Sequence, residues 1–319
     1  MSESTGLFVV VLAGGISHER DVSLRSGRRV ADALARAGHR VELRDPDAGL
    51  LPFLSEARPD VVFPALHGSS GEDGTLLELL SALGVPTVGS TGPAARRAWS
   101  KPVASSIVAG AGVTVPASIV LSHESFRELG AASVLRVIRE ALPGALVVKP
   151  ASGGSAQGVT IVEDPSDLPR AMVDAFTYAD AAVVEQRIVG TEVSVGIVET
   201  DGTARALTAV EIVPSAGVYS FQARYNAGET TFFAPCRLEA DAAARATEAA
   251  IAAHGALGLR DLSRVDLIVD EAGTPWFLEA NVLPGLTETS LMPLAIEASG
   301  TEATTVYDAL VRSAARRGA

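Results

Sequence analysis

The strongest constraint on the fold comes from residues 262–281, where two alternating stretches flank a short polar turn. Residues 262–270 and 276–281 alternate apolar with polar side chains, which predicts two β-strands. The residues between them have the composition of a hairpin turn. If Asp270 pairs with Pro275 across that turn, the register of the whole hairpin follows.

Four polar side chains then share one face of this hairpin. Asp266 lies opposite Glu279, and Arg264 lies opposite Asn281, because side chains alternate between the two faces of a strand. Opposed carboxylates repel unless a cation lies between them. Oxygen ligands without His or Cys suit Mg²⁺ or Mn²⁺, which are often shared with substrate phosphates. A solvated sheet face is the alternative, but the apolar neighbours and the Pro284–Gly285 turn favour a metal–nucleotide site.

Composition limits the class of protein. A chain of 319 residues suggests two or three domains, and 47% hydrophobic with 20% charged residues is typical of globular proteins. The net charge of −12 argues against nucleic acid or an anionic membrane surface as partner. A single cysteine, Cys236, excludes an intrachain disulfide and fits a reducing compartment. The N-terminal stretch has no signal-peptide pattern and no segment is a membrane span, so a cytoplasmic location is expected.

The first part of the chain, residues 1–98, is predicted to be a doubly wound α/β domain with a parallel sheet. A continuous apolar run at 7–13 indicates a strand that is buried on both faces. Ligands bind at the carboxyl ends of such strands, where Glu19 and His67 fall. The predicted order is strand 7–13, helix 22–37, strands 39–43 and 60–66, helix 75–83 and strand 85–88, followed by a loop at 89–97.

The second part, residues 99–182, is predicted to contain a glycine-rich hairpin. Strand 145–149 leads into the glycine-rich loop at 150–158, and a second strand follows at 159–162. This order differs from a P-loop, in which a helix follows the glycines. Backbone N–H groups of such a loop can cover phosphates, with Lys149 as a point charge at its base. A mobile surface hairpin is the alternative. Helices at 103–109 and from 124, and an extended stretch at 113–121, complete the segment.

The third part, residues 183–319, carries the opening hairpin. An apolar strand breaks at Glu185 and resumes at Thr191, which would offer backbone groups to an adenine base; a bulged strand is the alternative. The polar loop at 216–229 has a length that is usually functional. A strand at 208–213 and helices at 240–257 and 304–317 are also predicted.

Several motifs, taken together, resemble the D-alanine–D-alanine ligase branch of the ATP-grasp superfamily. They occur in the family's order and cover nearly the whole chain: GGISHERDVSLRSG, PALHGSSGEDGT, VVKPASGGSAQG, VVEQRIVGTEVSV, ARYNAG, SRVDLIVD and LEANVLPGLTETSL. The resemblance implies an ATP-grasp fold, with the N-terminal α/β domain followed by two ATP-grasp subdomains at 99–182 and 183–319.

The resemblance also implies roles for individual residues on the nucleotide side. Asp266, Glu279 and Asn281 would hold two Mg²⁺ (or Mn²⁺) ions that bridge the phosphates of ATP. The nucleotide itself would contact Lys101, Lys149, Arg224, Glu185, Ile188 and Glu192. Arg224 stands where the family usually carries a lysine, and Ala156–Gln157 stand where Ser–Val is usual.

On the substrate side, the resemblance implies that Glu19 holds the ammonium of the first D-alanine in a triad with Ser155 and Tyr225. Arg264 and the Gly285 N–H would stabilise an oxyanion. Three further residues would contact substrate: His67 near the first D-alanine, and Ser290 with the Leu291 N–H at the carboxylate of the second. Tyr225 is uncharged near neutral pH, which favours an amino acid over a hydroxy acid as the second substrate.

The implied function is ATP-dependent synthesis of D-alanyl-D-alanine through an acyl phosphate, for peptidoglycan precursors, by a cytoplasmic homodimer with small-molecule substrates. Because of the departures at Arg224 and Ala156–Gln157, a related ligase or cyclase acting on another amino acid in a specialised pathway is the alternative. A non-catalytic nucleotide-binding protein is a third hypothesis, against which the intact set of metal and oxyanion residues counts.

Overall fold

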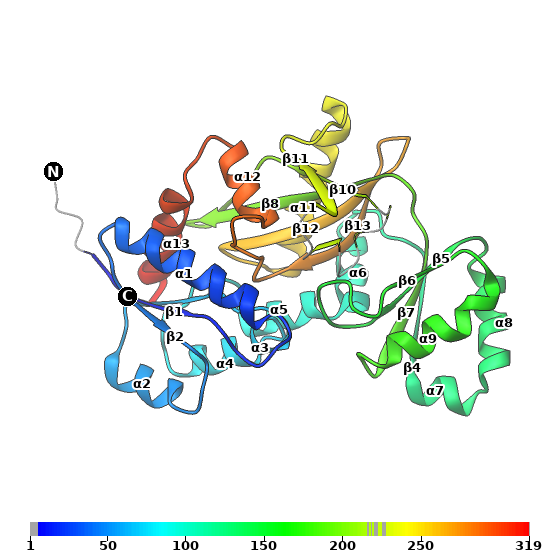
Figure 1. Ribbon diagram of the computed structural model, residues 1–319, viewed down its shortest axis with the longest axis horizontal. Coiled ribbons are helices and arrows are strands. Elements are labelled where there is room, and N and C mark those ends of the chain that lie inside the picture. Colours follow the sequence, from blue (N-terminus) through cyan, green and yellow to red (C-terminus); the bar gives the residue numbers. More distant parts are fainter. Residues whose placement is uncertain (1–5, 216, 218, 220–222, 225–227, 319) are drawn as a thin grey trace.

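The computed structural model describes residues 6–215, 217, 219, 223–224 and 228–318, and its strands form three sheets. The order is β2-β1-β3 in the first sheet, β4-β7-β5-β6 in the second, and β11-β10-β8-β12-β13 in the third, where β9 also pairs with β8. The second sheet and its helices form a lobe of their own on the right of Figure 1, whereas the other two sheets lie together on the left. The predicted mixed α/β class, with a parallel N-terminal sheet, is confirmed.

The parallel sheet is built from short strands, two of which are wholly apolar, whereas the edge strand β2 also carries Arg40, Glu42 and Arg44. β1 spans Phe8–Leu12, β2 spans Arg40–Arg44 and β3 spans Val61–Pro64. The helices around them are α1 (Arg20–Arg36), α2 (Leu50–Ala57), α3 (Ser69–Glu72), α4 (Thr75–Ala82) and α5 (Gly92–Trp99).

Two predictions for this region were wrong. Residues 85–88 do not form a strand, since only one parallel bridge, between Val62 and Thr87, joins them to β3. The predicted loop at 89–97 contains α5, which begins where Thr91 accepts a hydrogen bond from the Ala94 N–H with its hydroxyl oxygen. Such a hydroxyl cap satisfies one of the free amides of the first helical turn.

The central lobe has a hydrophobic core of its own. The lobe contains β4 (Ser118–Ser122), α7 (His123–Glu128), α8 (Ala131–Ala141), β5 (Leu146–Pro150), β6 (Thr160–Val162), the 3₁₀ turn η1 (Pro165–Asp167), α9 (Leu168–Phe176) and β7 (Ala181–Gln186). The helix that precedes it in the chain, α6 (Lys101–Gly110), instead packs Ala104 and Val108 into the core that contains Leu12 of β1. Ile138 of α8, Met172 of α9 and Val148 of β5 are fully buried together in this core. β7 crosses the predicted boundary at 182/183, and the division into three domains stays a prediction.

The third sheet shares its cores with the first. Its elements are β8 (Thr191–Thr200), β9 (Thr203–Ala206), β10 (Val210–Pro214), β11 (Thr230–Phe233), α11 (Ala240–Leu257), β12 (Leu262–Val269), β13 (Pro275–Asn281), α12 (Leu291–Ala298) and α13 (Ala303–Gly318). One core joins α11 and Val195 to Leu12 of β1, and another joins α12 and α13 to Val11. The first and third sheets, from opposite ends of the chain, therefore pack into one unit around shared cores.

The opening hairpin has the predicted register at its polar end but a different turn. Arg264 pairs with Asn281 and Asp266 with Glu279, as predicted, whereas Val269 rather than Asp270 pairs with Pro275. The turn is therefore one residue longer, and a bulge after Asp266 takes up the difference, which leaves Leu278 as the extra residue. The two deviations cancel, so the four polar side chains still meet.

Candidate active site

Two adjoining cavities lie where the lobes meet. The first, here called the hairpin cavity, has a volume of about 170 Å³ and lies between the glycine-rich loop and the β12–β13 hairpin. The second, the loop cavity, has a volume of about 140 Å³ and reaches from α1 to the loop before α12. Gly154, Tyr219 and Arg224 line both cavities, so a ligand in one is adjacent to a ligand in the other.

The predicted residues divide between these cavities. The hairpin cavity is lined by Lys101, Lys149, Glu185, Glu192, Asp266 and Glu279, and Ile188 lines a further cavity of about 430 Å³ together with Glu185 and Glu192. The loop cavity is lined by Glu19, His67, Ser155, Arg264, Asn281, Gly285, Ser290 and Leu291. Tyr225 lies outside the described residues. The structure brings the others together, and their individual roles stay predictions.

Asp266 is the most heavily bonded group of the hairpin. Its Oδ1 accepts hydrogen bonds from Ser194 Oγ at 2.7 Å and Arg264 Nε at 2.9 Å. Its Oδ2 accepts from Arg264 Nη2 at 2.8 Å and Asn281 Nδ2 at 3.2 Å. Burial opposes the charge of Arg264, but the Asp266 carboxylate outweighs it and raises the pKa of the guanidinium above its ordinary range. The bidentate pair is a charge-assisted contact of fixed geometry.

Glu279 connects the hairpin to the glycine-rich loop through Lys101. Lys101 Nζ lies 2.9 Å from Glu279 Oε2 and donates to the Gly153 carbonyl at 2.7 Å. Burial opposes the ionisation of Glu279, yet the nearby charge of Lys101 holds the pKa of this carboxyl well below its usual range. Glu279 is therefore an anion at any physiological pH.

These residues fit a hard cation. Among the described residues there is no group of three or more His, Cys, Asp and Glu that could hold a metal ion, so a metal site on this hairpin would combine its two carboxylates with another oxygen donor such as the Asn281 amide. Glu279 Oε1 and Asn281 Oδ1 accept no hydrogen bond from the described part of the chain, and oxygen donors of this kind suit Mg²⁺. Each oxygen of Asp266 already accepts two hydrogen bonds, so one of the donors, Arg264, Ser194 or Asn281, has to move for Asp266 to become a ligand.

Two further acidic groups, Glu185 and Glu192, line the hairpin cavity. Glu185 forms an ion pair with Lys149 at 2.7 Å, and both side chains are buried. Burial raises the pKa of Glu192 to about 7, against the opposing charge of Arg224. The break between Glu185 and Thr191 separates strands of different sheets, because β7 belongs to the central sheet and β8 to the third. The crossing segment, residues 187–190, therefore borders both lobes.

On the loop-cavity side, Ser155 Oγ donates a hydrogen bond to Glu19 Oε1. Ser155 has a left-handed backbone, with φ of 54°. Glu19 precedes α1 at the carboxyl end of β1, whereas Ser155 belongs to the glycine-rich loop, so this contact joins the two lobes across the cavity.

His67 braces the loop that carries Gly285. Its Nδ1 lies 3.2 Å from the Leu283 carbonyl, which can only accept, so Nδ1 carries the proton. Burial lowers the pKa of His67 and favours the neutral ring, in which Nε2 is an acceptor for the Ser26 hydroxyl at 3.2 Å. Ser26 in turn accepts from the Leu286 N–H at 3.1 Å. Both ring nitrogens are thus occupied by contacts within the protein.

The loop before α12 has little room for a side chain at position 285. A Cβ on Gly285 would lie 2.8 Å from Ser290 Oγ, which is too close. Ser290 Oγ contacts the Thr287 hydroxyl at 2.8 Å and the Thr287 N–H at 3.1 Å. Ser290 precedes α12, whose first N–H groups, beginning with Leu291, are the part of a helix that favours an anion.

Sequence reasoning did not single out Glu72, which also lines the loop cavity. Burial raises its pKa to about 8, the charge of Glu19 adds to the rise, and a hydrogen bond from the Gly68 N–H at 3.0 Å opposes it. The signal was present, since Glu72 lies five residues after His67 and ends the short helix α3 that follows β3, at the edge where ligands bind. Tyr219, which lines both cavities with Arg224 over its ring at 4.3 Å, was also not singled out.

Comparison with known proteins shows which family has this sequence and this architecture. A sequence model described as "D-ala D-ala ligase C-terminus" matches residues 107–312. A D-alanine–D-alanine ligase of Anaeromyxobacter sp. (strain Fw109-5) is 43% identical over 92% of both chains, and one from Gloeobacter violaceus is 40% identical over 92% of this chain and 94% of the relative. The ATP complex of D-alanine–D-alanine ligase from Bacillus anthracis superposes with a TM-score of 0.81 at 27% identity, covering 98% of this chain and 99% of that one. The VanG D-Ala:D-Ser ligase from Enterococcus faecalis gives 0.83 at 25% identity, covering 97% and 100%.

The fold is therefore the ATP-grasp fold, and the class of protein is that of the ATP-dependent ligases. Identity above 40% over nearly the whole chain specifies the group within that class. The chain belongs to the D-alanine–D-alanine ligase family. The resemblance inferred from the motifs is confirmed.

Proposed function

We propose that this protein is a D-alanine–D-alanine ligase that joins two D-alanines at the expense of ATP. The observation that carries the proposal is the junction of the two cavities at Gly154, Tyr219 and Arg224. A carboxylate in the loop cavity and the terminal phosphate of a nucleotide in the hairpin cavity would meet there. The relatives named above support D-alanine as substrate, and the specialised-pathway alternative is not favoured.

In the first step a D-alanine carboxylate oxygen attacks the γ-phosphorus of ATP, and the bond to the bridging oxygen of ADP breaks. Lys101, Lys149 and Arg224 supply positive charge around the hairpin cavity, as phosphoryl transfer requires. Glu19, which accepts a hydrogen bond from Ser155, would hold the ammonium of this D-alanine. The products of the step are ADP and an acyl phosphate.

In the second step the amine of another D-alanine attacks the acyl carbon. The nitrogen loses a proton, the bond from carbon to the phosphate oxygen breaks, and inorganic phosphate leaves. Arg264 and the Gly285 N–H lie along the loop cavity, where they would stabilise the tetrahedral oxyanion. Ser290 and the Leu291 N–H would fix the carboxylate of the incoming substrate at the start of α12.

The divalent cations belong to the hairpin. Glu279 and Asn281 have oxygens free for a metal within the described residues, and Asp266 would join them once Arg264 turns to the substrate. Mg²⁺ or Mn²⁺ bound there would neutralise phosphate charge. The release of Arg264 from Asp266 would at the same time make the guanidinium available to the oxyanion.

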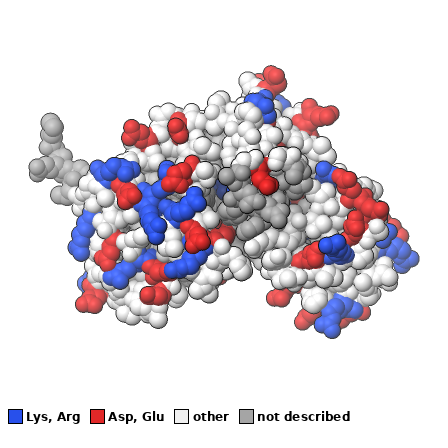
Figure 2. All heavy atoms as spheres, viewed as in Figure 1, with Lys and Arg blue, Asp and Glu red and all other residues white. Residues whose placement is uncertain are grey.

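The setting of the enzyme is part of the proposal. We infer a cytoplasmic homodimer that acts on small amino acids and supplies peptidoglycan precursors. No helix in the described part of the chain is long and apolar enough to span a bilayer. Lys and Arg are interspersed with Asp and Glu on the face shown in Figure 2, and the net charge is −12, which agrees with small-molecule substrates rather than nucleic acid.

The decisive test measures phosphate release from ATP with Mg²⁺ and D-alanine, with the product identified by mass. D-serine, D-lactate and L-alanine serve as comparison substrates at equal concentration near pH 7. We expect D-alanine to give the highest rate and D-alanyl-D-alanine as product. A folded protein that shows no D-alanine-dependent phosphate release, or that prefers D-lactate, would refute the proposal.

A further inference from the structure

A cavity of about 310 Å³ lies apart from the proposed active site, beside the end of α13. Its walls come from α4, the segment at 84–91, Arg260 and the last turn of α13, and none of the residues lining the hairpin or loop cavity contributes to it. The volume falls at the lower end of the range for small-molecule sites. Its lining residues are Leu77, Ser81, Gly84, Val85, Pro86, Thr87, Ser90, Thr91, Arg260, Ala314, Arg317 and Gly318.

Beside this cavity two arginines share one buried carboxylate. Asp261 is only 1% exposed, and Arg317 binds both of its oxygens, with Nη1 to Oδ1 at 2.8 Å and Nη2 to Oδ2 at 2.5 Å. The Gly89 N–H also donates to Asp261 Oδ2 at 2.8 Å. The hydrogen bonds to Asp261 therefore come from Arg317 and Gly89, and Arg260 adds only a longer ion-pair contact to Oδ2.

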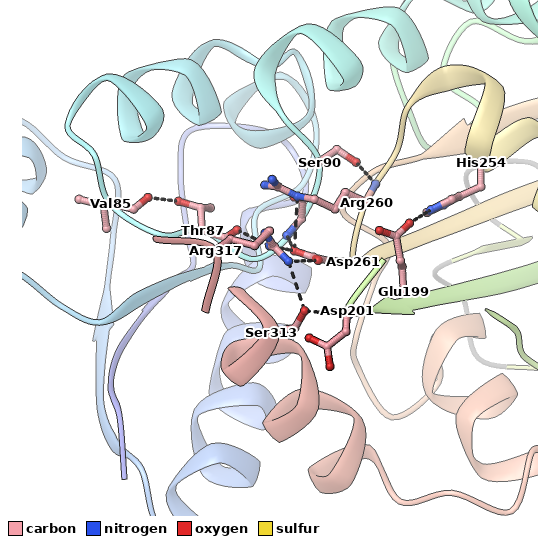
Figure 3. A network of polar contacts seen from close by, with 11 residues as sticks. Val85, Thr87, Ser90, Glu199, Asp201, His254, Arg260, Asp261, Ser313 and Arg317 are labelled. Carbon is pink, nitrogen blue, oxygen red and sulfur yellow. Dashed lines mark hydrogen bonds and ion pairs between the residues drawn. The ribbon is translucent and has the colours of Figure 1, made fainter. Parts of the chain in front are cut away.

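Arg260 is left with unused donors. Its Nε donates to the Gly89 carbonyl at 2.9 Å and lies 3.8 Å from Asp261 Oδ2. Its two terminal nitrogens have no hydrogen-bond or ion-pair partner among the described residues, and in Figure 3 they carry no dashed line and lie on the side where Val85 and Thr87 are drawn. Burial and the charge of Arg317 lower the pKa of Arg260, as expected where positive charge exceeds negative.

The rest of the lining adds donors and an apolar wall. Ser90 Oγ accepts a hydrogen bond from the backbone N–H of Arg260 at 3.2 Å. Thr91 Oγ1 accepts one from the backbone N–H of Ala94 at 3.4 Å. Each hydroxyl therefore still has its proton available for a ligand. The lining residues, all within the described ranges, include no Asp or Glu, whereas the chain as a whole carries a charge of −12. The apolar wall consists of Leu77, Val85, Pro86 and Ala314.

We propose that this cavity, the Arg260 cavity, binds a small organic anion. The oxyanion head, a carboxylate or a phosphate, would bind the free edge of the Arg260 guanidinium and the hydroxyls of Ser90 and Thr91. A short apolar body would lie against Leu77, Val85 and Pro86. A guanidinium edge with two terminal nitrogens matches either oxyanion in a bidentate contact.

The test is titration calorimetry on the full chain with acetate, butyrate, inorganic phosphate and butyl phosphate. A saturating non-hydrolysable ATP analogue with Mg²⁺ occupies the nucleotide site, including the position of the terminal phosphate, so that phosphate is not taken up there. Within each pair of ligands, we expect affinity to rise about fourfold for each added methylene that packs against the apolar wall. The comparison of butyrate with butyl phosphate identifies which head group the site prefers.

Two variants and one control isolate the site. Arg260→Gln removes the charge and should weaken butyrate binding about 10- to 100-fold. Ser81→Trp fills the cavity from the exposed end of α4 without touching Arg260, and should abolish binding even if Arg260→Gln is poorly folded. Arg312→Gln, which loses an ion pair of α13 with Asp308 at 2.8 Å outside the cavity, is the matched control and should bind as the wild type does.

Three results would overturn the proposal. The first is the absence of binding heat for every anion at concentrations up to about 10 mM, which is about ten times the Kd of a weak site of about 1 mM. The second is equal affinity for acetate and butyrate, or for phosphate and butyl phosphate, which would exclude an apolar body. The third is equal affinity in Arg260→Gln and Arg312→Gln.

Discussion

Replacing Glu72 by glutamine should make the ligand-free protein more stable than the wild type, and the difference should grow as the pH rises. Glu72 is half-buried, and burial, followed by the charge of Glu19, raises its pKa to about 8 from an ordinary value of 4.5. The folded protein therefore retains a proton that the unfolded chain releases in this window. Stability is full below pH 4.5, falls as the pH rises towards 8, and is level above it.

The magnitude follows from the width of that window. One pH unit corresponds to about 1.4 kcal/mol, so the interval from 4.5 to about 8 sets an upper limit of roughly 4–5 kcal/mol. Because the carboxyl is half-buried rather than fully buried, we expect about 2–3 kcal/mol at pH 8. Glutamine cannot ionise, and its side-chain oxygen can still accept the hydrogen bond from the Gly68 N–H. The variant should therefore not lose stability between pH 4.5 and 8 as the wild type does.

The assay is thermal unfolding of the wild type and Glu72→Gln between pH 4.5 and 9. We expect equal melting temperatures near pH 4.5 and a Tm about 3–6 °C higher for the variant at pH 8. Glu78→Gln is the matched control, since Glu78 is half-exposed on the neighbouring helix, and it should give a nearly constant difference. A Tm difference for Glu72→Gln that stays constant with pH, or grows as the pH falls, would refute the reasoning.

Three further predictions concern catalysis by the proposed ligase. Asp266→Asn or Glu279→Gln should lower kcat about 10²-fold or more, because each removes an anionic metal ligand from a site that positions phosphate; normal turnover of the folded double variant at saturating Mg²⁺ would contradict this. Arg224→Lys should retain activity because the charge is kept, whereas Arg224→Ala should lose it, and kcat of the two variants decides whether Arg224 acts on phosphate. Gly285→Ala should reduce kcat/KM at least about 10-fold because its Cβ would displace Ser290; an unchanged KM for D-alanine with unchanged kcat would show that this loop does not contact substrate.

Local pattern in the sequence was enough for the elements with strong periodicity. Helix α11 has the bounds that were predicted, and the alternation in β12 and β13 correctly put Asp266 opposite Glu279. Strand alternation depends only on neighbouring residues and on the pairing register, so it can be predicted from one stretch of the sequence. The turn was one residue too short in the prediction, because the bulge that leaves Leu278 extra depends on packing against the rest of the sheet.

The site required contacts that no local pattern encodes. His67 and Leu283 are 216 residues apart, and Ser26 and Leu286 are 260 apart, yet these contacts hold the loop that carries Gly285. The motifs predicted which residues gather, since each family motif marks one wall of the site. The hydrogen bonds among these residues, such as the bidentate pair of Arg264 with Asp266, follow only from their positions in the folded protein.

Burial was the quantity that only the tertiary structure decided. The sequence by itself determined the fold class, the family and the polar face of the hairpin, because these depend on residue type and spacing. It contains no measure of how much solvent each side chain retains, and solvent exposure sets the raised pKa of Glu72 and the unused donors of Arg260. Both residues lie in segments of ordinary composition, and both gain their chemistry from elements distant in sequence that exclude water around them.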